Sequence, residues 1–319
     1  MDSQELQELS VNNQSAIVPI APEGFKSGFV AIVGRPNVGK STLMNHLIGQ
    51  KIAITSPVAQ TTRNRLQGIL TTSEAQIIFV DTPGIHKPHH ELGKLLVQNA
   101  KTAIKSVDLV LFVVDSSTDA GTGDHFIFNI LKHLSVPVIL GLNKVDLQPK
   151  NYQFIDDSYA DLIADTDWST VKFSATTGVG TEQLQQALIE NLESGPYYYP
   201  PDLVTDQPER FIIAELIREQ ILLHTRQEIP HSVAITIEKM EETPKITKIN
   251  AAINIERSSQ KGIIIGKKGS MLKTIGTAAR KQIQKLISGG VYLELFVKVE
   301  PQWRQSRIRL AEFGYQVEE

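Results

Sequence analysis

The chain of 319 residues contains no cysteine, which excludes disulfide bonds and thiolate metal sites and fits a reducing compartment. No apolar run approaches the roughly 18 residues that a membrane-spanning helix needs. The first 27 residues carry Asp2, Glu5, Glu8 and Glu23 with Lys26 as the one basic residue, and they lack an apolar signal core. We therefore predict a flexible N-terminal extension over residues 1–27 rather than a targeting segment.

Charge is unevenly distributed along the chain. The formal net charge is −3, but residues 211–319 hold 17 Lys and Arg against 12 Asp and Glu, whereas residues 1–210 hold 15 against 23. A chain of this length accommodates two domains, and a hydrophobic fraction of 41% is enough for a core in each. An acidic domain followed by a basic one indicates that the two have separate tasks.

Four short motifs follow one another in the first part of the chain. They are Gly34-Arg35-Pro36-Asn37-Val38-Gly39-Lys40-Ser41, Asp81-Thr82-Pro83-Gly84, Asn143-Lys144-Val145-Asp146 and Ser174-Ala175. The first motif alone indicates only that a phosphate is held, and the third identifies the base. Together they predict a pocket for GTP or GDP, to which we also assign Thr42.

The first motif joins an apolar strand, residues 29–33, to a helix that we expect to begin at Ser41. Its backbone N–H groups therefore lie at a helix N-terminus, where the positive end of the helix dipole favours an anion. Gly34 and Gly39 let the backbone wrap closely around phosphate. We expect Lys40 to reach the β and γ phosphates and the Ser41 hydroxyl to ligate Mg²⁺.

A second buried strand, residues 77–80, delivers Asp81 to the same sheet edge. A carboxylate there can hold Mg²⁺ through water, and Gly84 can donate its N–H to the γ phosphate. A threonine of the loop Gln60-Thr61-Thr62-Arg63 then completes the metal shell. We favour Thr62 over Thr61, so the predicted metal ligands are Ser41, Thr62 and Asp81.

The third motif follows the apolar strand 138–142 and is predicted to recognise guanine. The Asp146 carboxylate can accept hydrogen bonds from guanine N1–H and the exocyclic amine, whereas adenine offers neither donor. Sites of this kind reject the wrong analogue by roughly 10⁴-fold or more. We expect Asn143 to brace the loops and the Lys144 stem to lie over the purine. The backbone of Ser174-Ala175 is expected to donate an N–H to guanine O6.

The group expected to act in hydrolysis comprises Asn37, Lys40, Thr62 and Gly84. The position after Gly84, where many related proteins have a water-orienting glutamine, holds Ile85, which predicts slow intrinsic turnover. Asn37 is a candidate to hold K⁺ against the phosphates. His86, His89 and His90 follow, but their spacing gives no ligand geometry, so a solvated loop is the favoured interpretation.

A proline-rich segment separates the two domains. The stretch Ser194-Gly195-Pro196-Tyr197-Tyr198-Tyr199-Pro200-Pro201 cannot continue a helix. We place the nucleotide domain at 28–194, the linker at 195–210 and the second domain at 211–319. For the first domain we predict an α/β fold with a mostly parallel sheet and helices on both faces. There is one phosphate loop, which excludes a tandem arrangement of two such domains.

The second domain shows the element order of an RNA-binding fold. A helix over 211–223, strands over 232–238 and 248–256, a helix from about 271 and a strand over 292–299 are predicted. A G-x-x-G segment, Gly266-Lys267-Lys268-Gly269, lies between the helix from about 271 and a further helix that we expect directly before the segment. This order, α-β-β-α-α-β, matches the α+β K-homology (KH) fold of the second type.

The G-x-x-G segment can clamp about four unpaired nucleotides, because glycine permits close approach of a sugar-phosphate backbone and lysine supplies charge. Residues 257–285 contain eight basic residues and no acidic one. The predicted RNA surface consists of Lys261, Gly266, Lys267, Lys268, Gly269, Lys273 and Arg280. Ile263, Ile264 and Ile265 either floor a groove for bases or pack in the core. Trp303 either extends the surface or packs inward.

Taken together, the chain resembles the Era family of bacterial GTPases, in which a Ras-like domain precedes a C-terminal KH domain. The resemblance rests on the first motif, Ala59-Gln60-Thr61-Thr62-Arg63, Asp81-Thr82-Pro83-Gly84-Ile85-His86, Ile265-Gly266-Lys267-Lys268-Gly269, and residues 293–299 with Trp303.

The resemblance implies a GTPase with Mg²⁺ that binds near the 3′ end of small-subunit ribosomal RNA, assists 30S subunit maturation and is coupled to cell growth. It also implies a cytoplasmic monomer with loose attachment to the inner membrane face. Two other functions stay open. One is a non-catalytic RNA-binding adaptor, which Ile85 favours. The other is a GTPase acting on transfer RNA or in a membrane process, against which the G-x-x-G domain argues.

Overall fold

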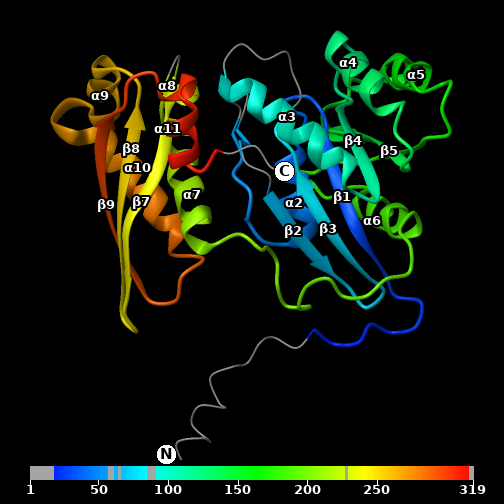
Figure 1. Cartoon of the computed structure of the whole chain (residues 1–319). Helices are drawn as coiled ribbons and strands as arrows, with labels where there is room; N and C mark the ends of the chain where they lie inside the picture. Colours follow the sequence, from blue (N-terminus) through cyan, green and yellow to red (C-terminus); the bar gives the residue numbers. More distant parts are fainter. Residues whose placement is uncertain (1–17, 57–60, 64–65, 85–90, 227–228, 316–319) are drawn as a thin grey trace, which may run out of the picture.

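The structure is a computed structural model that describes residues 18–56, 61–63, 66–84, 91–226 and 229–315. It consists of two sheet-based domains lying side by side (Figure 1). Several residues discussed above lie outside the described ranges, namely residues 1–17, Ala59, Gln60, Ile85, His86, His89 and His90. In the described part, no helix combines the length and the apolar character needed to cross a membrane.

The first domain is built on a six-stranded sheet with the order β2-β3-β1-β4-β5-β6. The strands are β1 (Lys26–Val33), β2 (Leu66–Thr71), β3 (Ala75–Asp81), β4 (Leu109–Asp115), β5 (Val138–Asn143) and β6 (Ser169–Lys172). Strand β2 is antiparallel to β3, and the other neighbouring pairs are parallel. The parallel strands bring their carboxyl ends to one edge, which is where a ligand crevice forms in such sheets. Strand β1 begins inside the range predicted as the extension.

Helices cover both faces of this sheet, because successive side chains of a buried strand point to opposite sides. In β1, Val30 and Ile32 join one core, and Ala31 and Val33 join the other. Helices α2 (Lys40–Ile48) and α6 (Thr181–Glu190) pack on the first face, and α3 (Glu91–Lys105), α4 (Thr122–Leu131) and α5 (Gln153–Leu162) on the second. The predicted α/β architecture is confirmed.

The second domain has a three-stranded sheet with the order β7-β8-β9. Its elements are α7 (Glu209–His224), α8 (Ile229–Ser232), β7 (Ala234–Glu242), β8 (Ile246–Ile255), α9 (Ser258–Ile265), the 3₁₀ turn η2 (Lys267–Gly269), α10 (Ser270–Ile283), β9 (Gly290–Val299), η3 (Trp303–Gln305) and α11 (Arg307–Glu312). Strands β7 and β8 are antiparallel, and β8 and β9 are parallel. The predicted α-β-β-α-α-β order is present, with the short helix α8 in addition.

Two alternatives left open by the sequence are resolved by burial. Ile264 is fully buried in α9 while Ile263 is 51% exposed, so at least one isoleucine of the run belongs to the core. Trp303 is fully buried, and its Nε1 donates to the Ser232 carbonyl at 3.0 Å. Trp303 therefore packs inward and does not extend the exposed surface.

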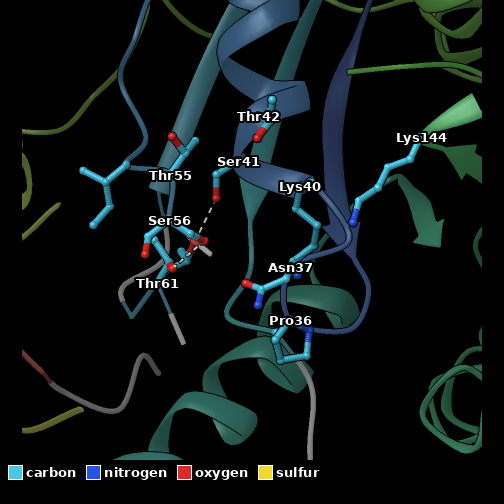
Figure 2. Close-up of a pocket in the computed structure, with 13 residues that line it drawn as sticks. Pro36, Asn37, Lys40, Ser41, Thr42, Thr55, Ser56, Thr61 and Lys144 are labelled. Carbon is cyan, nitrogen blue, oxygen red and sulfur yellow. Dashed lines mark hydrogen bonds between the residues drawn. The ribbon is translucent and has the colours of Figure 1, made fainter. Parts of the chain in front are cut away.

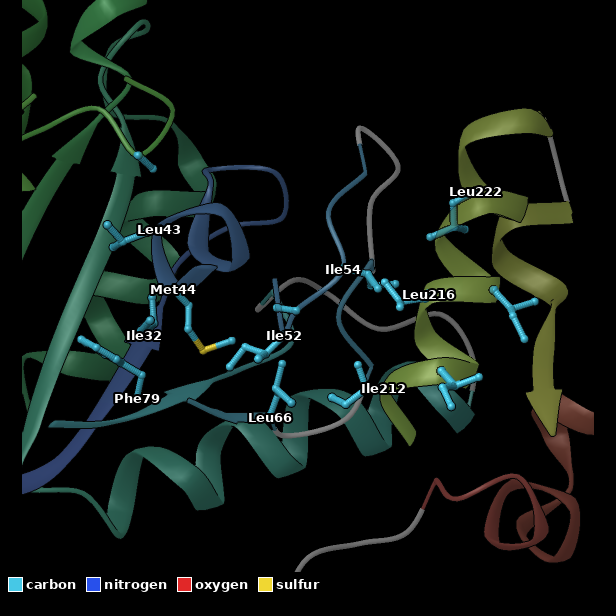
Figure 3. Close-up of a cluster of buried hydrophobic side chains, with 14 of the residues drawn as sticks. Ile32, Leu43, Met44, Ile52, Ile54, Leu66, Phe79, Ile212, Leu216 and Leu222 are labelled. Carbon is cyan, nitrogen blue, oxygen red and sulfur yellow. The ribbon is translucent and has the colours of Figure 1, made fainter. Parts of the chain in front are cut away.

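The two domains are joined by packing as well as by the chain. The segment before α7 runs along the first sheet, where Ile69 N–H donates to the Val204 carbonyl at 2.9 Å. Ile54, in the loop after α2, lies beside Leu216 of α7, and both belong to one hydrophobic cluster that continues across the domain boundary (Figure 3). Helix α7 is thus one element of the second domain that faces the nucleotide domain, and Leu92 of α3 packs against Trp303 and Leu310 at a second place.

Candidate functional site

A cavity of about 300 Å³ opens at the carboxyl edge of the first sheet (Figure 2). The loop between β1 and α2 forms one wall. Gly39 in this loop has a φ of 102°, and a Cβ there would lie 2.3 Å from the Asn143 amide nitrogen, so this position requires glycine. The cavity brings together the predicted residues Pro36, Asn37, Gly39, Lys40, Ser41, Thr42, Thr62, Gly84 and Lys144, and adds Ile54, Thr55 and Ser56.

Lys40 opens helix α2 and is almost completely buried, with 6% of its surface exposed. Its Nζ donates to the carbonyls of Gly34 at 3.1 Å and Arg35 at 2.9 Å, so the cation lies inside the loop (Figure 2). Burial lowers the pKa of Lys40 to about 8, and the Asp81 carboxylate opposes that shift. An anion in the loop would favour the charged form of this lysine.

Three oxygen-bearing side chains converge beside Lys40. The Ser41 hydroxyl donates to Asp81 Oδ2 at 2.7 Å and lies 3.0 Å from Thr62 Oγ1. Thr62 Oγ1 in turn donates to Asp81 Oδ2 at 3.2 Å. Burial raises the pKa of Asp81, against the opposing effects of Lys40 and the two hydroxyls.

This cluster fits a hard divalent cation. Within the described part of the chain, the buried Asp81 Oδ1 has no hydrogen-bond partner. Hydroxyl and carboxylate oxygens with room for water are the ligands that Mg²⁺ prefers. The neighbouring Thr61 points elsewhere, because its Oγ1 donates to the Ser56 carbonyl at 3.4 Å. Of the two threonines considered from the sequence, Thr62 is the one that lies with Ser41 and Asp81.

Asn143 connects the phosphate loop to the base-recognition segments. Its Nδ2 donates to the Val38 carbonyl at 2.7 Å, and its Oδ1 accepts from Ala175 N–H at 2.9 Å. Ser174 N–H donates to the Val179 carbonyl at 2.8 Å. Both N–H groups of Ser174-Ala175, one of which we expected to donate to guanine O6, therefore have protein acceptors in this structure. The predicted contact requires that the base share one of these N–H groups with its present acceptor.

The two charged residues of the third motif differ in their surroundings. Lys144 has a φ of 67°, and its Nζ pairs with Asp115 Oδ2 at 2.6 Å beside the cavity. Burial opposes ionisation of Asp115, but the hydrogen bonds from Lys144 and Ser117 prevail and hold the pKa of this carboxyl below its ordinary value. Asp146 is exposed in the 3₁₀ turn Val145–Leu147, and its carboxylate has no hydrogen bond to another described residue.

Some residues of the motifs support the loop instead of lining the cavity. Arg35 turns its side chain away, and its Nε donates to the buried Asp124 at 2.7 Å, so only its backbone belongs to the phosphate loop. The Thr82 hydroxyl donates to the Ile32 carbonyl at 2.9 Å. Val38 and Pro83 are buried.

The predicted RNA surface forms one end of the second domain. Helix α9 ends at Ile265 with Gly266 as its C-cap, and the turn η2 presents Lys267 and Lys268 to solvent. Gly269 has a φ of 79°, and a Cβ added there would meet no atom within 4 Å, so the backbone of this turn is open to an approaching chain. Lys261, Lys273 and Arg280 are exposed on the flanking helices α9 and α10.

A groove extends from this turn between α10 and β9. It is lined by Gly269, Leu272, Lys273, Gly276, Thr277, Arg280, Tyr292, Leu293 and Leu295. Tyr292 is 52% exposed, so its ring is available for stacking. The sequence patterns identified Gly269, Lys273 and Arg280 but missed the apolar floor and Tyr292. The alternation of β9 predicts a strand without telling which of its faces borders α10.

The chain is similar over almost its whole length to known proteins. Residues 29–144 match a family model described as 50S ribosome-binding GTPase, and residues 228–304 match a KH domain model. The chain is 75% identical over 313 residues to GTPase Era of Crocosphaera subtropica, with coverage of 98% of this chain and 99% of the relative.

Two crystal structures also match, each with a TM-score of 0.87, 40% identity and coverage of 91% of this chain and 99% of the solved one. One is a variant of Aquifex aeolicus Era bound to GDP and AlF4−. The other is Era in complex with MgGDPNP and nucleotides 1506–1542 of 16S ribosomal RNA.

Proposed function

Because this chain belongs to the Era family of GTPases, we propose that it is a GTP-hydrolysing switch that binds small-subunit ribosomal RNA near its 3′ end and assists maturation of the 30S subunit. One observation carries the proposal: a single chain holds the cluster of Lys40, Ser41, Asp81 and Thr62 and an exposed G-x-x-G turn beside a groove. The Era complex with 16S RNA supports the small subunit rather than the 50S of the family model's description.

The nucleotide half works through positioning and charge. The N–H groups at the start of α2 and the Lys40 cation hold the phosphates. Ser41 and Thr62 would hold Mg²⁺ directly and Asp81 would hold it through water, and the ion would supply positive charge against the phosphates. Asp146 selects guanine. Because Ile85 cannot orient water, we expect slow turnover without RNA.

The RNA half works through close backbone approach. Lys267 and Lys268 contact phosphates while Gly266 and Gly269 leave room for the sugar-phosphate chain. The groove with Tyr292 receives unpaired bases. Nucleotide state and RNA affinity are linked in this proposal, and that linkage is reciprocal. RNA affinity should therefore differ between the GDP form and the form with a nonhydrolysable GTP analogue.

Phosphate release tests the proposal directly. We expect slow release of phosphate from GTP with Mg²⁺, and faster release when RNA ending in the 16S 3′ sequence is added. An RNA of the same length and composition but scrambled sequence is the control for charge. If RNA binds tightly and no phosphate is released under either condition, the protein is a non-catalytic RNA-binding adaptor.

A monovalent cation is proposed as a second inorganic partner. Asn37 belongs to the phosphate loop, lines the cavity and is exposed, with a φ of 64°. This position supports Asn37 as the candidate to hold K⁺ against the phosphates. A cation held there would supply positive charge to the phosphates. Equal hydrolysis rates in sodium and potassium buffers would exclude this role.

We further propose a cytoplasmic monomer with weak peripheral attachment to the inner membrane face. The positive charge of residues 211–319 supports an attraction to anionic surfaces. Sedimentation of the full chain measures its oligomeric state. Flotation with vesicles containing anionic lipid, compared with neutral vesicles, measures the membrane contact.

A further inference from the structure

The segment that carries Thr62 is held at both ends by helix α7 of the second domain. At its beginning, Glu219 accepts from Thr55 N–H at 2.8 Å and pairs with Lys51 at 2.6 Å. At its end, Arg218 donates through Nη2 to the Thr61 carbonyl. Arg218 is itself fully buried and is fixed by Glu215, whose carboxylate accepts a hydrogen bond from Arg218 Nε at 2.7 Å. The residue next to Thr62 on the amino side is therefore anchored across the domain boundary.

The residue on the other side of Thr62 is anchored there too. The Arg63 side chain is 1% exposed and lies within the second domain. Its guanidinium donates to the Val233 carbonyl at 2.6 Å and to the Pro230 carbonyl at 2.9 Å. Its central carbon lies 6.0 Å from the centre of the Trp303 ring and 5.9 Å from that of Tyr315. Rings at such distances attract a cation.

This environment makes the position of Arg63 conditional on the second domain. In the described part of the chain no carboxylate pairs with Arg63, and its Nε has no hydrogen-bond partner. Burial lowers the pKa of the guanidinium, because a site removed from water disfavours a charge. A buried charge is retained only where other groups compensate it. Here those groups are two carbonyls, the Tyr315 hydroxyl at 3.4 Å and two rings of the second domain.

The carbonyls that hold Arg63 belong to a segment that also contacts α9, the helix before the G-x-x-G turn. Ser232 lies in α8 between Pro230 and Val233, and its hydroxyl accepts from Gln260 Nε2 at 2.8 Å. Gln260 is part of α9, which runs into Gly266. Continuous contacts thus lead from Thr62 to the start of the proposed RNA surface.

We propose that Arg63 and Arg218 are positioning residues that hold Thr62 beside Ser41 and Asp81, so that the second domain completes the triphosphate-specific part of the nucleotide site. The inference rests on the proposed GTPase function and deepens it. Neither arginine touches nucleotide in this scheme. Both act through Thr62, which matters for Mg²⁺ and the γ phosphate and not for GDP.

The test uses the full chain with Arg63→Met and Arg218→Met, each compared with Arg210→Met, an exposed arginine on the same helix as Arg218. Affinities for GDP and for a nonhydrolysable GTP analogue are measured with Mg²⁺. We expect unchanged GDP affinity, analogue affinity lower by about tenfold or more, and a higher Mg²⁺ concentration for half-saturation. Arg63→Lys should retain part of the analogue affinity that Arg63→Met loses, because lysine keeps the charge but lacks the guanidinium that donates to two carbonyls at once.

A double-mutant cycle separates positioning from general stability. If Arg63 acts through Thr62, then Arg63→Met causes no further loss of analogue affinity in a Thr62→Ala background. Three results would overturn the inference. They are a loss of analogue affinity of the same size in both backgrounds, equal losses of affinity for GDP and analogue, and no loss of affinity for either nucleotide.

RNA provides a further readout. Adding RNA with the 16S 3′ sequence should raise the analogue affinity of the wild type more than that of Arg63→Met. An equal effect on both would contradict the role of Arg63. A wild-type chain that binds neither nucleotide would instead refute the proposed function itself, and that outcome is distinguishable from all the others.

Discussion

The amide of Asn143 lies between Val38 and Ala175 and bonds to the backbone of both, donating at 2.7 Å and accepting at 2.9 Å. Val38 belongs to the phosphate loop and Ala175 to the segment after β6. One buried side chain therefore sets the separation between the part of the pocket that holds phosphate and the part that faces the base. Asn143 thus supports nucleotide binding by holding these two segments in place and not by touching the nucleotide.

Asn143→Ala is expected to weaken nucleotide binding and stability together. The substitution leaves a carbonyl and an N–H without partners, at a cost of about 1–3 kcal/mol for each group that stays buried. Chemical denaturation and the affinity for a fluorescent GDP analogue measure the two effects. Asn129→Ala is the matched control, because Asn129 is exposed on α4 and, among the described residues, its side chain bonds to the His125 carbonyl alone. Equal losses in both variants would contradict the bracing role.

Asp146→Asn is expected to change the preferred base. An amide can donate to the C2 oxygen of xanthine but cannot accept both guanine donors, so affinity should shift from GTP toward xanthosine triphosphate. The loss for GTP is expected to reach roughly 10³-fold or more, since a paired donor is left without its acceptor. Competition between the two nucleotides measures the shift. Full GTP affinity in this variant would show that the carboxylate is not the base reader.

Much of the nucleotide site could be predicted because its parts are local. Apolar runs of strand length mark buried strands, and a motif at the end of such a run must lie at the carboxyl edge of the sheet. For that reason the meeting of Ser41 and Asp81 was predictable from two separate segments. Thr62 follows no apolar strand, and its place beside them was expected only once the other motifs had indicated a metal site. The G-x-x-G turn was predictable in the same way, from glycine spacing between two helices.

The sequence patterns could not predict contacts between side chains that lie far apart in the sequence. Arg63 follows Thr62 in an ordinary polar loop, and nothing local indicates that its side chain enters a site formed by Pro230, Val233 and Tyr315. Glu219 and Arg218 resemble the polar face of an amphipathic helix, yet both are buried at the domain interface. Interface residues of this kind look like surface residues until the second domain is placed.

Nucleotide affinity is expected to fall as pH rises above about 8. Burial lowers the pKa of Lys40 to about 8 in the free protein, and a bound phosphate raises it again. The complex therefore holds more protons than the free protein between these two pKa values, so affinity drops by about tenfold per pH unit in that window. Below pH 8 the lysine is charged in both forms and this contribution is constant. Isothermal titration of GDP across pH 7–10 measures the slope, and Lys40→Ala should abolish it along with most of the affinity.

Gly269→Asp is expected to abolish RNA binding while leaving GDP binding intact. The position has a φ of 79° and open space around a Cβ, so the substitution causes modest backbone strain of about 1 kcal/mol. Its main effect is a carboxylate placed where an RNA phosphate must approach beside Lys267 and Lys268. Gly24→Asp is a matched control, with a φ of 77° and equally open surroundings in the other domain. Filter binding of an RNA with the 16S 3′ sequence should therefore show a loss of affinity in Gly269→Asp alone. A comparable loss in Gly24→Asp would mean that the added negative charge acts at long range and that the turn is not the point of contact.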